Sequence, residues 1–301
     1  MRAVDLFAGW GGFTAGAELA GVRVVWAANH WPLAVQVHQA NHPHVVHACQ
    51  DLHQADWTSL PAFDLLLASP ACQGHSTASQ PRRRQYHDAM RATAYAVTAC
   101  ADVTRPKAIV VENVLSFRRW DLYGNWLDGL RALGYHVTER VAEATASGVP
   151  QRRKRLVITA TRKPRPIRLR CQPGREPAFG PCIDLKADRW RDVAAAPGDT
   201  KSRLLAAQKR FGRCLVHQTT GHRGISLDEP IRTITTKDQW LLLDGDRYRS
   251  LTMREYARGQ SFAEDYTWPD GLPRTDVLRG IGNAIPSLMA RDAIVAAMEA
   301  M

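Results

Sequence analysis

The chain lacks several features that would assign it to a membrane or a secreted class. It contains no run of eighteen apolar residues, and its N-terminus enters an apolar strand pattern without the regions of a signal peptide. Its six cysteines form no CxxC pair, so neither a disulfide framework nor a zinc knuckle is indicated. We therefore expect a cytoplasmic protein with no metal and no membrane contact. One alternative stays open, a redox or zinc site formed by Cys171, Cys182, Cys214 and His217.

Acidic residues are scarce relative to basic ones. The chain has 40 Lys and Arg against 29 Asp and Glu, which gives a formal net charge of +11 over 301 residues. Such an excess is typical of proteins with a polyanionic partner, above all nucleic acid. The basic residues also cluster, at 82–84, 152–155 and 162–170. The charge pattern therefore indicates nucleic-acid binding.

The first 160 residues or so alternate short apolar runs with amphipathic ones. This alternation is typical of a parallel sheet covered by helices on both faces. The expected strands are 3–7, 22–29, 63–69, 107–114, 135–142 and 155–161, and the expected helices are 13–20, 31–41, 86–104 and 121–133.

The composition and the periodicity of the sequence change after residue 163. Pro, Arg and Gly are scattered through the next stretch with little periodicity, which predicts a separate lobe rich in loops and β structure. A short helix and a Gly turn leading into a C-terminal helix follow. We expect three segments: a ligand-binding domain at 1–163, a small domain at 164–250, and a return to the first domain at 251–301.

A glycine loop follows the first expected strand. Gly9, Gly11 and Gly12 would let the backbone approach a ligand closely at a helix N-terminus. In nucleoside-binding crevices the next strand usually ends in an acidic residue that grips the ribose. Here it ends in Asn29 and His30, so an amide would have to do that work. Asp51 is the nearest carboxylate suited to an adenine amino group.

Two apolar strands end in reactive groups. Cys72 follows the strand at 63–69, and Glu112 stands at the end of the strand at 107–114. Because the carboxyl edge of a parallel sheet faces the ligand crevice, both side chains should share one pocket. A thiolate and an acid together suit the addition of a soft nucleophile to an electron-poor ring whose nitrogen is protonated. This pair therefore indicates a pyrimidine substrate.

Taken in order, six motifs resemble the DNA (cytosine-5)-methyltransferase family: DLFAGWGGFTAG, SPACQGHS, VVENV, GVPQRRKRLVI, RTIT and GIGNAIP. The resemblance covers nearly the whole chain outside residues 164–228. It implies a Rossmann-like α/β sheet of the S-adenosylmethionine-dependent methyltransferases with a small target-recognition lobe. It also implies sequence-specific methyl transfer to carbon 5 of a flipped-out cytosine in double-stranded DNA, through a covalent adduct of Cys72.

The resemblance implies roles for individual residues, which fall into three groups. The catalytic residues would be Cys72, Glu112, Asn113, Arg153 and Arg155. The S-adenosylmethionine-binding residues would be Phe7, Gly9, Gly11, Gly12, Asn29, His30, Asp51, Leu52, Pro70, Asn283 and Ala284. The DNA-binding residues would be Gln73, Ser76, Gln151, Arg152, Arg232 and Thr233.

Two residues depart from the family pattern, because Ala71 stands where proline is usual and His75 where an aromatic residue is usual. Two alternative functions also stay open: methylation of a tRNA cytosine, and a catalytically silent DNA-binding homologue. The stretch HQTTGHRG, with side chains suited to base edges, favours DNA. We expect a monomer, and the sequence leaves open whether a restriction endonuclease accompanies it.

Overall fold

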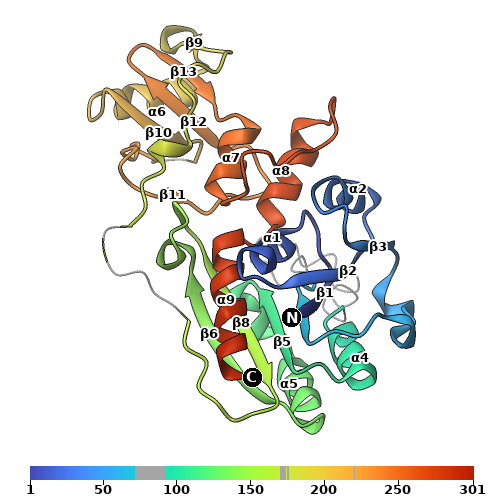
Figure 1. Cartoon of the computed structure of the whole chain (residues 1–301). Helices are drawn as coiled ribbons and strands as arrows, with labels where there is room; N and C mark the ends of the chain where they lie inside the picture. The colour runs from blue at the N-terminus through green and yellow to red at the C-terminus, as the bar shows by residue number, and fades with distance from the viewer. Residues whose placement is uncertain (72–92, 170–173, 175, 220) are drawn as a thin grey trace.

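A seven-stranded sheet forms the centre of the computed structural model, which describes residues 1–71, 93–169, 174, 176–219 and 221–301 (Figure 1). The strand order is β3-β2-β1-β4-β5-β8-β6. The strands are β1 (Arg2–Leu6), β2 (Arg23–Asn29), β3 (Val46–Cys49), β4 (Leu65–Ala68), β5 (Ala108–Asn113), β6 (His136–Glu143) and β8 (Lys154–Thr161). All six expected strands are confirmed, and β3 was missed because its half-exposed sequence VHAC has no apolar run.

The sheet is mostly parallel, and the expectation of a wholly parallel sheet is wrong at β8. This strand runs antiparallel to both β5 and β6. Only residues 144–153 join β6 to β8, with a 3-10 turn and the two-residue strand β7 (Gln151–Arg152). A parallel connection needs a crossover of about a dozen residues or more, usually a helix, so this link enforces an antiparallel pair.

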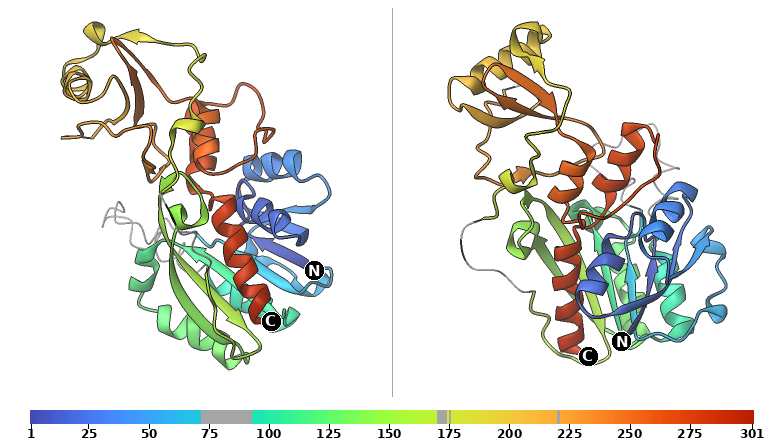
Figure 2. Two further views of the ribbon diagram at one scale, coloured as in Figure 1. Left: turned by 60° about the vertical axis from the view of Figure 1, so that its left-hand side comes forward. Right: turned by 45° about the horizontal axis from the view of Figure 1, so that its top comes forward.

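Alternate residues of the central strands enter two different cores. Leu65 and Leu67 face α1 (Gly12–Leu19) and α9 (Ser287–Ala300), whereas Leu66 faces α4 (Tyr95–Thr104) and α5 (Tyr123–Ala132). The two-residue period of a strand produces this division. Figure 2 shows α9 lying along the sheet, so the C-terminal segment returns to the first part of the chain.

The segment 180–250, which we call the small lobe, has more regular structure than expected. It holds an antiparallel sheet ordered β10-β12-β13-β9 and a helix, α6 (Gly198–Gln208). The helix was missed because only Leu204 and Ala207 of its polar sequence are buried. The strands are β9 (Arg191–Asp192), β10 (Arg213–His217), β12 (Trp240–Asp244) and β13 (Arg247–Ser250).

The remaining elements connect the small lobe to the main sheet. Strand β11 (Ile231–Arg232) pairs with β7, and the helices α7 (Met253–Gly259), α8 (Arg274–Asn283) and α2 (Pro32–Asn41) share a third core between the two parts. Within the described residues, no helix is both long and apolar enough to cross a bilayer.

Gly280 on α8 is predicted to tolerate no side chain. A Cβ there would lie 2.0 Å from Cε2 of Trp10, which is itself buried. We expect Gly280→Ala to lower the free energy of unfolding by about 2–3 kcal/mol through overpacking, as measured by urea denaturation. Gly124→Ala is the matched control, because nothing lies within 4 Å of its Cβ position in α5. The control should leave stability unchanged or raise it by up to about 1 kcal/mol. Equal effects of the two substitutions would contradict the packing argument.

Candidate active site

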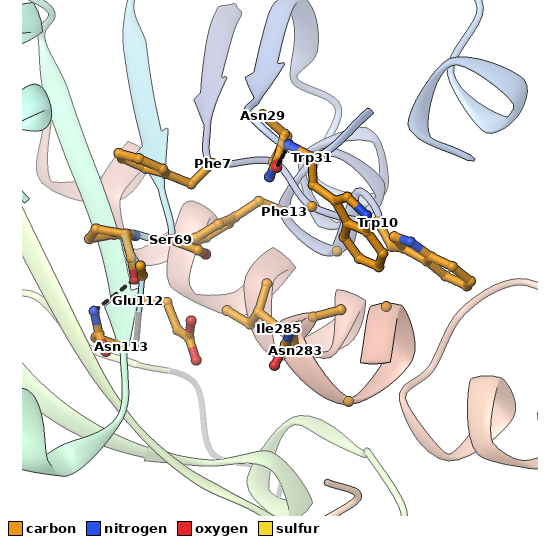
Figure 3. Close-up of a pocket in the computed structure, with 18 of the residues that line it drawn as sticks. Phe7, Trp10, Phe13, Asn29, Trp31, Ser69, Glu112, Asn113, Asn283 and Ile285 are labelled. Carbon is orange, nitrogen blue, oxygen red and sulfur yellow. Dashed lines mark hydrogen bonds between the residues drawn. The ribbon is translucent and has the colours of Figure 1, made fainter. Parts of the chain in front are cut away.

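A cavity of about 220 Å³ lies at the carboxyl edge of the sheet (Figure 3). Its walls come from the segments that follow β1 and β4, from the ends of β2 and β5, and from the turn between α8 and α9. Ligands of open α/β sheets bind at this edge. Twelve expected site residues line it: Phe7, Gly9, Gly12, Asn29, His30, Pro70, Glu112, Asn113, Arg153, Arg155, Asn283 and Ala284.

Glu112 and Asn113 end the buried strand β5 and are themselves almost fully buried. The carboxylate of Glu112 accepts the guanidinium of Arg155 at 2.9 Å, and this ion pair fixes it at the cavity wall. Asn113 Nδ2 donates to the carbonyl of Pro70 at 3.1 Å, which ties the end of β5 to the segment after β4. Ala71 also lines the cavity. Cys72, Gln73 and Ser76 lie outside the described residues.

Arg153 has a different position from the one expected for a residue at the target base. Its side chain is buried and donates to the carbonyls of Ile234 (2.9 Å), Gly282 (2.9 Å) and Ala284 (3.1 Å). Ile234 follows β11 by two residues, Gly282 lies in the last turn of α8, and Ala284 is the residue after that helix. Arg153 therefore supports the cavity wall and joins it to the small-lobe side, and its expected contact with the target base or phosphate stays a prediction.

The glycine loop is only partly at the cavity. Gly9 adopts φ +55°, and a Cβ there would meet nothing closer than the carbonyl of Phe7 at 3.8 Å, so it leaves room for a ligand. Gly11 does not line the cavity. It backs onto His42 and Tyr266, and a Cβ would lie 2.8 Å and 2.7 Å from them. This close packing alone requires a glycine at position 11, and the expected ligand contact of Gly11 stays a prediction.

The end of β2 supplies an amide. Asn29 Oδ1 accepts the backbone N–H of Trp31 at 2.9 Å, and Asn29 itself lines the cavity. Asp51 and Leu52 do not line the cavity, contrary to expectation. Asp51 is exposed and caps the turn after β3 by accepting the N–H of His53, and Leu52 packs into the core.

The expected DNA-binding residues divide into buried and exposed. Gln151 is fully buried: its amide donates to Gly259 O and Gln260 Oε1 and accepts Ile234 N–H, so the structure gives the expected DNA contact no support. Arg152 is exposed and forms an ion pair with Glu176 at 2.7 Å. Arg232 is exposed on the adjacent strand, and Thr233 donates to Arg152 O.

The cysteines of the small lobe do not form a site in the described part of the chain. Cys182 and Cys214 are buried in different cores, and burial raises the pKa of Cys182 to about 12 and that of Cys214 to about 11. Cys171 lies outside the described residues. Among those described, no group of three His, Cys, Asp or Glu side chains could hold a metal ion. The structure thus gives the zinc alternative no support.

Several cavity residues were missed by the sequence analysis. Trp10, Phe13, Trp31, Ser69, Arg279 and Ile285 all contribute to the walls. Trp31 could have been found, because it follows the end of β2 by two residues. Arg279 could also have been found, since it precedes Asn283 by one helical turn and so shares its face of α8.

A buried polar chain supports the glycine loop and predicts a pH dependence. Thr14 Oγ1 donates to Asp5 Oδ2 at 2.8 Å, and His38 Nε2 lies 3.0 Å from Thr14 Oγ1. Burial raises the pKa of Asp5 to about 7. In the folded protein this carboxyl keeps its proton up to about pH 7, whereas the unfolded chain releases it near pH 4. Its contribution to stability is therefore present below pH 4 and is lost as the pH rises through 7.

This dependence can be isolated with Asp5→Asn. The difference in unfolding free energy, wild type minus variant, should fall between pH 4 and 7 with a slope of up to about 1.4 kcal/mol per pH unit. Urea denaturation at pH 5, 6, 7 and 8 measures it. Burial lowers the pKa of His38 and His47, and both histidines are present in the two proteins that are compared. A difference that stays constant with pH would show that Asp5 titrates normally.

The fold and the cavity together define the class of the protein. A mostly parallel sheet with one antiparallel strand near the sheet edge, and a cavity at the carboxyl ends of its strands, are the features of the Rossmann-like methyltransferases. Solved structures of the same fold include Entamoeba histolytica methyltransferase EhMeth (TM-score 0.70, 15% identity) and S. pombe Dnmt2 methyltransferase (TM-score 0.70, 18% identity). Each alignment covers 99% of this chain and 98% of the other.

Sequence comparisons narrow the class. A family model described as C-5 cytosine-specific DNA methylase matches residues 1–190, so the chain belongs to this family. It is a sequence-specific DNA cytosine-5 methyltransferase. Type II methyltransferase M.NlaX of Neisseria lactamica is 27% identical over 95% of this chain and 92% of its own. M.HgiDI of Herpetosiphon aurantiacus is 32% identical over 54% of this chain and 52% of its own.

Proposed function

We propose that the cavity binds S-adenosylmethionine and that Glu112, Arg155 and Cys72 carry the methyl transfer to a cytosine of duplex DNA. The observation that carries the proposal is the buried Arg155–Glu112 pair, which lines the same cavity as the glycine loop and Ala71, the residue before Cys72. The catalytic acid, the nucleophile's strand end and the donor-binding loop therefore meet in one place.

The residues present fit an adenosyl donor. Phe7, Phe13 and Trp31 offer aromatic surface for a purine or a cationic group, and the amide of Asn29 is placed for ribose hydroxyls. The open space beside Gly9 is the room that a Cβ would occupy. When bound, the donor supplies an electrophilic methyl group on a sulfonium sulfur.

The protein's own residues make cytosine reactive. Carbon 5 is a poor nucleophile, so the Cys72 thiolate adds at carbon 6 and converts the ring into an enamine. Glu112, oriented by Arg155, supplies a proton or hydrogen bond at ring nitrogen 3 and disperses the charge. After carbon 5 has accepted the methyl group, loss of its proton expels the Cys72 sulfur. Because carbon 6 is hidden in a stacked duplex, the target nucleotide must flip out first.

The biological setting follows from the relatives. M.NlaX and M.HgiDI are named as Type II methyltransferases, and we propose that this chain likewise acts on double-stranded DNA in the cytoplasm of a prokaryotic or phage-infected cell. We propose a monomer that works beside a cognate restriction endonuclease.

Bisulfite sequencing of DNA from a host that expresses the protein tests the proposal directly. We expect one short sequence to become methylated at cytosine, and a Cys72→Ser control to leave it unmethylated. The purified protein should also form a covalent adduct with duplexes carrying 5-fluorocytosine at that site. Transfer of labelled methyl groups to tRNA but not to duplex DNA would overturn the DNA assignment in favour of RNA. No transfer to either would favour a silent homologue.

Salt should weaken the binding of duplex DNA steeply. Each phosphate neutralised by Lys or Arg releases counterions, so the logarithm of affinity falls linearly with the logarithm of salt concentration. Arg232 is exposed on β11, and we expect Arg232→Ala to reduce that slope by about 1. Arg131→Ala on α5, an exposed arginine paired with Asp128, should leave the slope unchanged. Fluorescence anisotropy between 50 and 300 mM salt measures the slope for the wild type and both variants. Equal slopes for all three proteins would show that Arg232 does not contact a DNA phosphate.

A further inference from the structure

Arg279 is a cavity arginine whose charge is not matched by a carboxylate in the described part of the chain. Three arginines line the cavity. Arg155 is committed to Glu112, and Arg153 is buried against three carbonyls. Arg279 instead lies over the indole of Trp31, with Cζ 4.6 Å from the ring centroid. Its positive charge and its N–H groups are therefore available to an anionic ligand.

Trp31 is held in place from its own side. Its backbone N–H donates to Asn29 Oδ1, and it immediately precedes Pro32 at the first position of α2. Proline there is pre-organised for the helix and fixes the entry of the chain. The partly buried indole packs against the third core, so it offers the guanidinium a supported surface, and the planar guanidinium presents its donors as a rigid fork.

Arg279 is also fixed through its helix. It stands on α8 one turn before Asn283, and both are exposed on the face that lines the cavity. Arg153 and Gln260 hold the turn at the end of α8 through the carbonyls of Gly282 and Ile281. The close contact of Gly280 with Trp10 fixes the neighbouring residue. The position of the guanidinium is therefore largely set before any ligand arrives.

The place of this pair in the cavity indicates which anion it meets. Figure 3 shows Trp31 on the side of the pocket away from Glu112, and the proposed function places the target base at Glu112. A DNA phosphate would approach from the side of the base. The donor named under the proposed function carries one anionic group, the carboxylate of its amino-acid part.

We propose that Arg279 binds the α-carboxylate of S-adenosylmethionine, with Trp31 holding the guanidinium in register. This inference rests on the proposed function, which places the donor in the cavity. An arginine fork pairs with a carboxylate through two parallel charge-assisted hydrogen bonds. Arg279 would then select a donor that keeps its carboxylate.

Calorimetric binding of two ligands tests the contact without any turnover. The ligands are S-adenosylmethionine and its decarboxylated form, which lacks only the carboxylate. The wild type should bind the intact donor about 10–100-fold more tightly. Arg279→Met should lose that factor for the intact donor and change affinity for the decarboxylated form less than about threefold. Arg279→Lys should recover part of the loss, and Arg131→Met, the surface control, should match the wild type for both ligands.

Other outcomes overturn the inference in distinguishable ways. Equal loss of both ligands in Arg279→Met would mean that the residue contacts a shared part of the donor or only supports the wall. Unchanged donor binding with weaker duplex binding would assign Arg279 to a DNA phosphate. If the wild type bound neither ligand, both the donor site of the proposed function and this inference would be wrong.

Discussion

Glu112→Gln is expected to reduce the methylation rate by about 10²–10⁴-fold, the usual contribution of a positioned general acid. Glutamine keeps the size of the side chain and an oxygen that can accept from Arg155, now 2.9 Å from the carboxylate. It cannot deliver a proton to ring nitrogen 3. The loss should therefore appear in kcat, measured by single-turnover transfer of labelled methyl groups, with the affinity for the donor nearly unchanged.

Glu139→Gln is the matched control for Glu112→Gln. Glu139 pairs with Arg118 at 3.0 Å on β6 and does not line the cavity. It also accepts a hydrogen bond from the Tyr123 hydroxyl, and it should keep the wild-type rate because none of these three side chains lines the cavity. A Glu112→Gln enzyme within threefold of the wild-type rate would mean that another group supports the ring, and the assignment of Glu112 would be wrong.

Arg153→Met is expected to lower the free energy of unfolding by about 3 kcal/mol or more. Methionine fills the volume but leaves the buried carbonyls of Ile234 and Gly282 without their Arg153 donor, and each such group costs about 1–3 kcal/mol. Because Gly282 precedes Asn283 at the cavity wall, donor affinity should fall as well. Urea denaturation and calorimetry measure the two effects.

The neighbouring residue provides the control for Arg153→Met. Arg152 is exposed and paired with Glu176 at 2.7 Å, so Arg152→Met should change the unfolding free energy by less than about 1 kcal/mol. The same chemical change at adjacent positions would thus differ severalfold in effect. Similar stabilities for the two variants would contradict the clamp formed by Arg153.

The sequence was most informative where one local signal was enough. Apolar runs predicted the central strands such as β4 and β5, because a strand buried on both faces must be apolar throughout, whereas the half-exposed β6 was predicted without such a run. The position of Glu112 after such a run predicted its place at the carboxyl edge, and the structure puts it in the cavity. Residues 72–92 lie outside what the structure describes, so the placement of Cys72 stays a prediction from the sequence.

The sequence was misleading where one short motif holds residues with opposite surroundings. In QRRKR, Gln151 and Arg153 are buried, Arg152 and Lys154 are exposed, and Arg155 reaches Glu112. From the sequence alone, such a cluster of basic residues predicts a single charged surface. Two things decide which of these side chains face inward: the alternation of a strand, and partners that are distant in the sequence, such as Ile234 and Gly282.

By itself, the sequence determined the order of the strands along the chain, the glycine loop and the acid at the end of β5, because these depend on residue type and local periodicity. Only the tertiary structure decided that β8 enters the sheet antiparallel, that Arg153 is a buried clamp and that Arg279 lies over the indole of Trp31 at the wall of the cavity. Arg279 and Trp31 are separated by most of the chain. No local pattern specifies such a contact, since it forms only when the C-terminal helices return to the first strands.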